Sequence, residues 1–459
     1  MTCVAAGGQC VIGPDARCAG QVLTTYDCNP QRNPAGAICC LASNPPDAGV
    51  DAGPDAGIDG GLDAGPDAGL DAGVDAGPDA GPDAGADAGI DAGPFVCVLD
   101  AGMCTPGVAS DLSSTSMTKA GPFWALASGD LNGDGLLDLV AVRTPLSDEY
   151  GFRVFFGEPD GGLSSGVSYP LSYGGRGIAI GDIDGDGFPD VAIADGDQID
   201  IFANDGGGGL NLLSLISASD SVGQVGIGDF NGDGIADLAF TVYFADVEIA
   251  LGQGSGTFST PAAIPGVGGG HSGILVVADL NQDCLADIVA DLPANPNGGL
   301  VVLINLGDGG FQQTSYATPA YPSQAAVIPN PSGPPDLVFG GLDTGNSTGI
   351  QVLKNNGDGT FALGPSATVA GEWIAVGDFN GDCIPDIATS LLSDCHAGDS
   401  QLWVLYGEAD GGLSAPQNLQ QSQPSGLLAV VGPIGSPRAF VSYGNCAHVL
   451  TVFGDASRH

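Results

Sequence analysis

A nine-residue acidic segment occurs five times between residues 130 and 386 and limits the possible folds more than any other feature. Each copy has Asp at positions 1, 5 and 9 and Asp or Asn at position 3. The copies cover residues 130–138, 182–190, 229–237, 279–287 and 378–386. Hard cations such as Ca²⁺ take six to eight oxygens, which calcium loops supply from alternate side chains and one backbone carbonyl. The segments therefore predict metal-binding loops.

We expect each loop to bind one Ca²⁺ through the side chains at positions 1, 3, 5 and 9 and the carbonyl oxygen at position 7, which allows up to five ions. The expected ligands are Asp130, Asn132, Asp134, Leu136 and Asp138; Asp182, Asp184, Asp186, Phe188 and Asp190; Asp229, Asn231, Asp233, Ile235 and Asp237; Asp279, Asn281, Asp283, Leu285 and Asp287; and Asp378, Asn380, Asp382, Ile384 and Asp386. The alternative is an Asp-rich turn capped by its own side chains. Five copies with one ligand spacing favour metal binding.

The loops mark a structural repeat. Their first Asp residues are separated by 52, 47, 50 and 99 residues, and the last interval is two periods long. Residues 333–336 match the end of a loop in which only Asp336, at position 9, is kept. One period after the last complete loop, Arg438 stands where the final ligand would be. The chain therefore has seven units, five with complete loops and two degenerate.

Each unit contains four short apolar or alternating runs bounded by turn residues, a pattern typical of strands. In the second unit these runs are residues 177–181, 191–194, 199–202 and 210–215. Four strands in about 50 residues, repeated seven times, predict an all-β, seven-bladed β-propeller over residues 95–459.

The last unit ends after its third strand, at residues 449–454, whereas an additional strand-like segment near residues 105–118 precedes the first unit. We expect this N-terminal strand to complete the last blade. Such pairing closes the ring and removes exposed sheet edges.

The motif Asp-x-(Asn/Asp)-x-Asp-Gly-x-x-Asp at this period resembles the FG-GAP/VCBS repeats, which also form integrin α-subunit propellers. The resemblance covers residues 105–459 and implies calcium binding. Its members include adhesins, lectins and non-catalytic modules of enzymes, so it implies binding more than catalysis. Cys284 and Cys383 replace Gly at loop position 6, and Gln282 replaces Gly at position 4. A non-Gly residue in a left-handed turn costs about 1 kcal/mol, so weaker calcium binding is expected in those two loops.

Two further regions precede the propeller. Residues 1–43 contain six cysteines and are expected to form a small disulfide-rich module, whose fifteen possible pairings stay open. Cys3 could alternatively be a lipid-modified terminus. Residues 44–94 repeat Asp-Ala-Gly-X. Their Gly, Pro and regularly spaced like charges predict a disordered, solvated linker, and they resemble linkers of myxobacterial surface and secreted proteins.

The net charge of −45 argues against nucleic-acid binding and against anionic membranes. No apolar run is long enough to span a membrane. Twelve cysteines indicate an oxidising compartment, so we expect an extracellular or outer-surface location, with a targeting signal upstream of this sequence. Bridges are expected between Cys97 and Cys104 and between Cys395 and Cys446. A cytosolic protein with reduced thiols or zinc sites is the alternative.

No catalytic motif is present. The four histidines, His271, His396, His448 and His459, lie outside known ligand or nucleophile patterns, and the metal loops use the clustered Asp residues. We therefore expect a protein that is not an enzyme.

The residues that enter each first strand should converge on the face opposite the loops. They include aromatic, Arg, Gln and His side chains that suit a glycan or protein ligand: Trp124, Arg176, Gln224, His271, Gln324 and Trp373. Trp124 and Trp373 could instead pack between blades.

The sequence thus predicts a calcium-stabilised propeller that binds glycan or protein in adhesion or recognition. One alternative is a hydrolase, lyase or enzyme subunit that acts on polysaccharide through the axial funnel. Another is a passive structural component of the envelope.

Overall fold

The computed structural model describes part of the chain, and all the described residues belong to one compact unit. They are residues 112–119, 123–143, 150–159, 162–243, 246–268, 274–292, 299–317, 321–330, 333–342, 348–369, 371–390, 402–419, 427–433, 439–444 and 449–455. The expected cysteine module (1–43) and linker (44–94) lie outside them. So do Cys97, Cys104, Cys395 and Cys446, so the two bridges expected there stay predictions.

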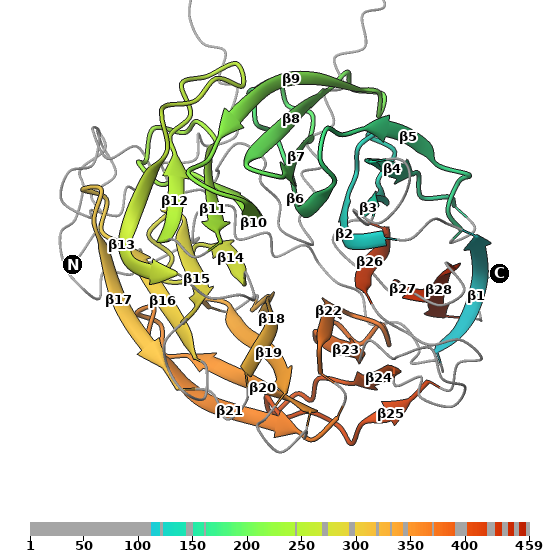
Figure 1. Cartoon of the computed structure of the whole chain (residues 1–459). Coiled ribbons are helices and arrows are strands. Elements are labelled where there is room, and N and C mark those ends of the chain that lie inside the picture. The colour runs from blue at the N-terminus through green and yellow to red at the C-terminus, as the bar shows by residue number, and fades with distance from the viewer. Residues whose placement is uncertain are drawn as a thin grey trace, which may run out of the picture. The chain divides into compact units, whose positions relative to one another are not determined.

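The described residues form antiparallel sheets arranged in a ring (Figure 1). Five sheets have four strands each, and every strand pairs with the next along the chain. The first two are β6 (Gly175–Gly181), β7 (Asp190–Asp195), β8 (Gln198–Asn204) and β9 (Leu210–Ser217), then β10 (Val222–Gly228), β11 (Asp237–Val242), β12 (Asp246–Ala250) and β13 (Ala262–Gly268). The next two are β14 (Leu275–Ala278), β15 (Asp287–Asp291), β16 (Leu300–Asn305) and β17 (Phe311–Tyr316), then β18 (Tyr321–Ile328), β19 (Asp336–Leu342), β20 (Thr348–Asn355) and β21 (Phe361–Ala367). The fifth contains β22 (Trp373–Gly377), β23 (Asp386–Ser390), β24 (Leu402–Leu405) and β25 (Gln417–Asn418).

The sixth sheet has eight strands, in the order β1-β28-β27-β26-β3-β4-β5, with β2 paired to β3. Their bounds are β1 (Leu112–Lys119), β2 (Phe123–Gly129), β3 (Leu136–Arg143), β4 (Gly151–Phe155), β5 (Val167–Pro170), β26 (Leu428–Pro433), β27 (Ala439–Gly444) and β28 (Val449–Asp455). The prediction of seven separate blades is therefore wrong, because the strands of the first and last units share one sheet and the ring has six sheets.

The missing acidic loop of the last unit explains this sharing. In the last unit Arg438 stands at loop position 9, so Val430 stands at position 1. The strand β26 nevertheless continues to Pro433. Without an Asp to turn the chain at that point, the strand reaches the first unit, where Gly432 pairs with Leu137.

The two ends of the described chain pair with each other. β1 runs antiparallel to β28, from Leu112 opposite Asp455 to Lys119 opposite Val449, with one irregularity between Ser114 and Ser116. Figure 1 shows the two strands side by side. The strand expected near residues 105–118 is seen at 112–119. It covers the edge that β28 would otherwise expose.

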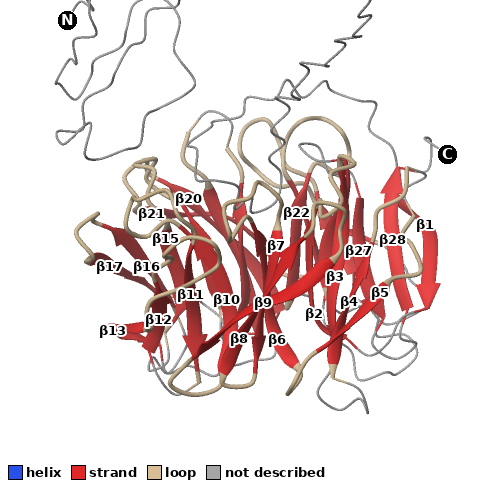
Figure 2. Cartoon of the chain, turned by 90° about the horizontal axis from the view of Figure 1, so that it is seen from above, coloured by secondary structure: helices blue, strands red, loops and turns tan. Residues whose placement is uncertain are grey.

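The core lies between neighbouring sheets. In the view of Figure 2 the strands run across the thickness of the ring and the loops gather at its two ends. Second strands such as β7, β15 and β23 are buried along their whole length. One core cluster joins Val140 and Phe152 of the eight-stranded sheet to Val191 and Ile193 of the next sheet. Sheets covered on both faces explain the continuous apolar runs of the sequence.

Within the described ranges, no helix has the length and hydropathy that a membrane crossing requires.

Deletion of Leu112–Lys119 should lower the melting temperature by roughly 5 °C or more, because it removes the backbone pairing with β28 and leaves an open sheet edge. Differential scanning calorimetry of the full chain and the deletion variant measures this. Removing eight residues of the Asp-Ala-Gly-X segment is the length-matched control and should leave the melting temperature unchanged. Equal melting curves for all three proteins would contradict closure by β1.

Candidate functional site

The acidic loops are built by hydrogen bonds from their own backbone. In the first loop, Oδ1 of Asp130 accepts the N–H groups of Gly133 (2.8 Å) and Asp134 (3.2 Å), and its Oδ2 accepts that of Gly135 (2.9 Å). The side chains at positions 3 and 5 each accept the N–H two residues later. Three of these bonds recur in all five loops. The side chains at positions 3 and 5 accept the N–H groups of positions 5 and 7, and the Asp at position 1 accepts the N–H group of position 6. The loops therefore hold their oxygens in one repeated arrangement.

The turn at positions 4 and 6 requires left-handed backbone. Glycine occupies both positions in three loops, for example Gly133 (φ 71°) and Gly135 (φ 83°). Gln282 (φ 62°), Cys284 (φ 71°) and Cys383 (φ 72°) adopt the same conformation without being glycine. The strain expected from these replacements is thus present, at roughly 1–2 kcal/mol per residue.

Both cysteines are also disulfide-bonded, which the sequence pattern did not reveal. At these two loop positions the sequence pattern indicates a lost glycine and gives no sign of a disulfide bond.

The aspartate at position 9 ties each complete loop to the third strand of its sheet. Oδ2 of Asp138 accepts the N–H of Leu131 at loop position 2, and Oδ1 accepts the N–H of Gly157 beyond β4, both at 2.8 Å. The equivalent bonds in the other four complete loops measure 2.6–2.9 Å. All five carboxylates are fully buried. These residues thus have a structural role besides the predicted one as ligands.

Burial raises the pKa of these carboxyl groups, and the backbone N–H donors offset only part of the rise. The pKa is about 7 for Asp138, Asp237, Asp287 and Asp386, and about 6 for Asp190. Nearby loop carboxylates add to the rise, because like charges disfavour ionisation.

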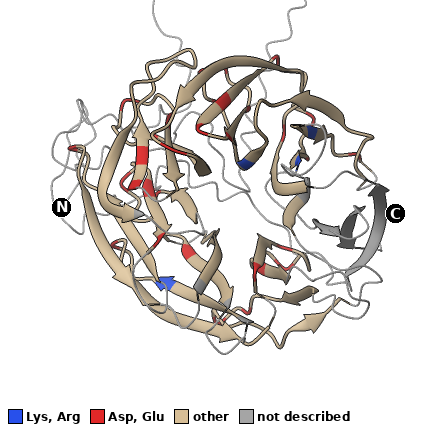
Figure 3. Ribbon diagram, viewed as in Figure 1, with Lys and Arg blue, Asp and Glu red and all other residues tan. Residues whose placement is uncertain are grey.

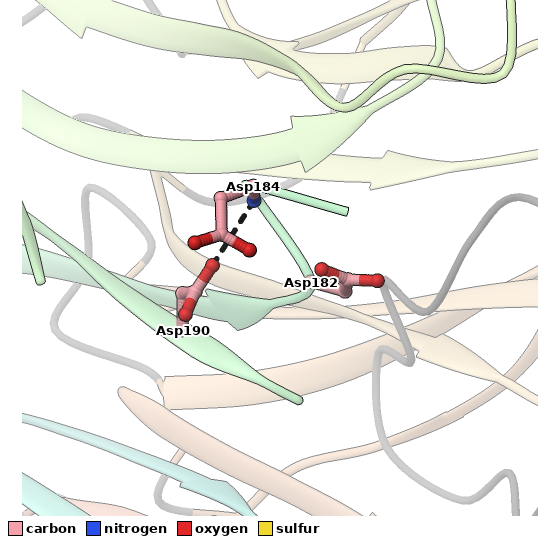
Figure 4. A group of neighbouring side chains, drawn as sticks. All are labelled: Asp182, Asp184 and Asp190. Atoms are coloured by element: carbon pink, nitrogen blue, oxygen red, sulfur yellow. Dashed lines mark hydrogen bonds between the residues drawn. The ribbon is translucent and has the colours of Figure 1, made fainter. Parts of the chain in front are cut away.

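The second loop brings three carboxylates closest together. One oxygen from each of Asp182, Asp184 and Asp190 lies within 4.8 Å of the others (Figure 4). Burial and the charge of Asp186 raise the pKa of Asp184. Ionised carboxylate oxygens have lone pairs beyond those that accept the N–H groups, so the group can hold a hard cation such as Ca²⁺.

In the degenerate fifth unit, the ammonium group of a lysine lies beside the aspartate at loop position 9. Lys354 Nζ lies 2.8 Å from Oδ2 of Asp336, the one loop aspartate that this unit keeps. Oδ1 of Asp336 still accepts the N–H of Asn355 at 2.8 Å. The complete units have Phe156, Ala203, Leu251, Ile304 and Tyr406 at the position of Lys354. A lysine thus faces the position-9 aspartate in a unit without a metal loop.

Three asparagines that sequence reasoning missed join neighbouring units. Nδ2 of Asn204, Asn305 and Asn355 donates to the carbonyl oxygen at loop position 2 of the preceding unit, at 2.8–2.9 Å from Leu131, Phe230 and Leu280 respectively. Each asparagine ends a third strand and begins an Asn-x-Gly sequence. That recurrence is the signal that could have identified them.

The opposite end of the sheets, where the first strands begin, is called the entry face here. Four first strands have β-bulges at this end, between Phe123 and Ala125 in β2, Gly175 and Ile178 in β6, Val222 and Val225 in β10, and Pro322 and Gln324 in β18. The bulged residues include three of the predicted ligand residues: Trp124, Arg176 and Gln224. Bulges redirect side chains and are frequent beside functional sites.

The structure brings two of these side chains together with a tyrosine. The Arg176 guanidinium lies 5.6 Å from the Trp124 ring centroid and 5.1 Å from that of Tyr243. Its Nη1 donates to the Tyr243 hydroxyl at 2.8 Å. Trp124 is 44 % exposed. Arg176 is therefore held between two aromatic rings at the surface.

The remaining predicted ligand residues are placed differently. Trp373 is partly buried against two core clusters, and its Nε1 is buried without a hydrogen-bond partner. Gln324 accepts the N–H of Ile374 and so connects β18 with β22. His271 lies outside the described residues, as do the other three histidines.

The raised aspartate pKa values predict an unusual pH dependence in the metal-free state. A pKa of 6–7 in the folded chain and about 3.9 in the unfolded chain means that the folded state binds more protons between those values. Stability in EDTA should therefore increase as the pH falls from about 7 toward 4, and decrease as the pH rises. Melting temperatures at pH 7.5 and 5.5 measure the effect.

Asp287→Asn removes one of these groups and should reduce the pH slope. Asp308→Asn changes an exposed aspartate in a turn outside the loops and should leave the slope unchanged. A melting temperature that falls between pH 7.5 and 5.5 in EDTA would rule out this origin of the pH dependence.

Comparisons with known proteins agree with this arrangement. The FG-GAP-like repeat family matches residues 130–193, 182–240, 229–290 and 330–389. No curated protein matches the sequence. Among solved structures, the chain resembles BBS1N in complex with ARL6DN, from crystals soaked with mercury, at 12 % identity and a TM-score of 0.51 over 76 % of this chain and 99 % of that chain. The lead-soaked crystals of the same complex give the same identity and TM-score.

A lectin of Agrocybe aegerita, described as specific for non-reducing terminal N-acetylglucosamine, is more distant. It is 20 % identical with a TM-score of 0.44, over 68 % of this chain and 81 % of that chain. These likenesses to solved structures concern the fold alone. The four matched repeats and the ring of antiparallel sheets show that the chain is a β-propeller protein with FG-GAP-like repeats.

Proposed function

We propose that the chain is a calcium-stabilised binding module, acting outside the cell or on its surface, that recognises a glycan or a protein with its entry face. The observation that carries the proposal is the contact of Arg176 with Trp124 and Tyr243. Three units of the ring contribute these residues.

The local backbone supports a role in binding. Trp124 and Arg176 both occupy β-bulges, and the indole of Trp124 is 44 % exposed and lies against the Arg176 guanidinium. Aromatic and Arg side chains are enriched where proteins bind partners. By contrast, no catalytic group other than carboxylates and tyrosines has been found on the described part of this face, so we expect no enzyme activity.

A fold of this kind is compatible with a partner surface, since the similar BBS1N structure was solved in complex with ARL6DN. The chemistry of the entry face, rather than that likeness, decides the class of ligand proposed for this chain. The net charge of −45 argues against nucleic acid.

The calcium assignment follows from the repeated loop geometry. Five loops each present four carboxylate or amide side chains in the same hydrogen-bonded arrangement, and the three or four carboxylates among them repel one another unless a cation neutralises them. Up to five ions fit the five complete loops. Their role is structural, because the loops lie at the end of the sheets opposite the entry face.

An oxidising location is supported by the two disulfide-bonded cysteines of the ring, Cys284 and Cys383. Stable disulfides are typical of extracellular and cell-surface proteins.

Calcium should raise the melting temperature and EDTA should lower it, because an ion that binds only the folded state stabilises it by about 2.7 kcal/mol per site at 100 times Kd. Calorimetric titration should give up to five sites. Asp233→Asn, at position 5 of the third loop, should remove one site, whereas the exposed control Asp308→Asn should keep the full number. Identical melting curves in calcium and in EDTA would exclude a structural calcium role.

Binding by the entry face should depend on Trp124. The full chain is screened in calcium against a glycan array and a panel of extracellular proteins, and the strongest ligand is titrated with the variants. Trp124→Ala should weaken binding about tenfold or more, since truncating an interface Trp typically costs more than 1 kcal/mol. The control Leu363→Ala removes an exposed apolar side chain from β21 and should bind normally. Failure to bind any glycan or protein, or normal binding by Trp124→Ala, would refute the proposal.

A further inference from the structure

We propose that Arg176 anchors a binding site for a carboxylate-bearing sugar, such as a uronic acid residue of a short glycan, because the net charge of −45 opposes a long acidic polysaccharide as it opposes nucleic acid. This inference rests on the proposed function, because it names the ligand class of the same entry face. Four observations support it: the fixed position of the guanidinium, the lack of a carboxylate partner for it among the described residues, the aromatic surroundings and the amide of Gln224.

The guanidinium is held in place before any ligand arrives. It lies between the rings of Trp124 and Tyr243, at 5.6 and 5.1 Å from their centroids, and Nη1 donates to the Tyr243 hydroxyl. Cation–π contacts on two sides restrict the rotamers of a side chain that is otherwise flexible. A preorganised cation loses less conformational entropy when it binds an anion.

Among the residues that the structure describes, the positive charge of Arg176 has no carboxylate partner. Figure 3 shows how sparse Lys and Arg are in the described ring, and the whole chain has nine of them against 54 Asp and Glu. Yet within the described ranges no carboxylate lies at ion-pair distance from Arg176, whereas Lys354 pairs with Asp336 at 2.8 Å. A guanidinium has five N–H donors, and one of them is used by Tyr243. The remaining donors suit the two oxygens of a carboxylate.

Two acidic side chains on strands of the same units are already engaged. Asp195, opposite Gly175 in the sheet, accepts the N–H groups of Ser172 and Tyr173 at 2.8 and 2.9 Å. Glu248 on β12 accepts the hydroxyl of Ser219. These bonds keep both carboxylates directed to their own partners, so Arg176 stays available for a ligand.

The surroundings favour a sugar over an aliphatic peptide segment. At the entry face, the exposed large apolar residues of the described chain are aromatic, namely Trp124, Tyr150 and Tyr173, whereas the exposed leucines lie on outer strands or near the acidic loops. Flat aromatic rings pack against the C–H face of a pyranose ring, and their polar edges can hydrogen-bond its hydroxyls.

Gln224 supplies a neighbouring amide. A Cβ atom added to Gly177, next to Arg176, would lie 2.7 Å from the Cα of Gln224 and 3.1 Å from its Oε1. Glycine therefore lets β6 and β10 approach closely here. The Gln224 amide thus lies beside the residue that follows Arg176 in the chain, from where it can bond hydroxyls of a sugar whose carboxylate the guanidinium holds.

The test compares two probes on the full chain in calcium by isothermal titration calorimetry: oligogalacturonate, and the same oligosaccharide with its carboxylates methyl-esterified. The unmodified chain should bind the acid about 10- to 100-fold more tightly than the ester, the range expected for a charge-assisted hydrogen bond. Arg176→Gln should reduce binding of the acid to the level of the ester. Equal affinity for acid and ester would overturn the proposal.

Two further variants keep the result interpretable. Lys119→Gln changes the net charge of the chain as much as Arg176→Gln does and should bind normally. Tyr243→Phe removes only the hydroxyl that holds Nη1 and should weaken binding of the acid several-fold while the melting temperature stays unchanged, so the inference is testable even if Arg176→Gln fails to fold. Normal binding of the acid by both Arg176→Gln and Tyr243→Phe would refute it.

The outcomes separate this inference from the proposed function. Trp124-dependent binding of a neutral glycan, with no preference for the acid, would leave the proposed function intact and refute the acidic-sugar site. Polyglutamate that binds as tightly as oligogalacturonate, with the same dependence on Arg176, would also refute the sugar assignment and indicate an acidic protein partner. Absence of binding to any glycan or protein would refute both.

Discussion

The ring depends on a buried aspartate that each complete unit uses twice. One oxygen of this position-9 carboxylate accepts an N–H group at the start of the acidic loop. The other accepts an N–H group at the end of the third strand or just beyond it. The bonds therefore join two connections that lie far apart in the sequence. Burying five such groups raises their pKa toward neutrality. The same carboxylates face loops that can bind a cation, so local folding and ion binding share one set of atoms.

Much of this architecture could be predicted, because it follows from repetition. The spacing of the loops indicated the ring of antiparallel sheets, and the glycine pattern indicated where Gln282, Cys284 and Cys383 would need left-handed backbone. The number of sheets could not be derived in that way. It depends on two residue pairs between β26 and β3, and a count of repeats does not show whether neighbouring units share hydrogen bonds.

The candidate binding face was only partly predictable. Register placed Trp124, Arg176 and Gln224 at the same end of the sheets, but strand spacing alone does not show which side chains touch. Which side chains touch also depends on the β-bulges at the starts of the strands. The contact between Arg176 and Tyr243, moreover, joins residues 67 positions apart in the sequence. Trp373 also stands at the start of a first strand, yet it is partly buried against two core clusters. An aromatic residue at a strand start is therefore an ambiguous signal until its neighbours are known.

The lysine of the fifth unit neutralises that unit's loop aspartate without an ion from solution. Lys354 belongs to the chain itself, so it stays beside Asp336 at every calcium concentration, whereas a bound ion can dissociate. Under the proposed calcium binding, a ring that combines this lysine with loops filled from solution is not uniform around its circumference. Scarce calcium would leave the fifth unit with its neutralising partner, while the units on either side would lose theirs. It can then act as a fixed reference from which the other loops reorder when the ion returns.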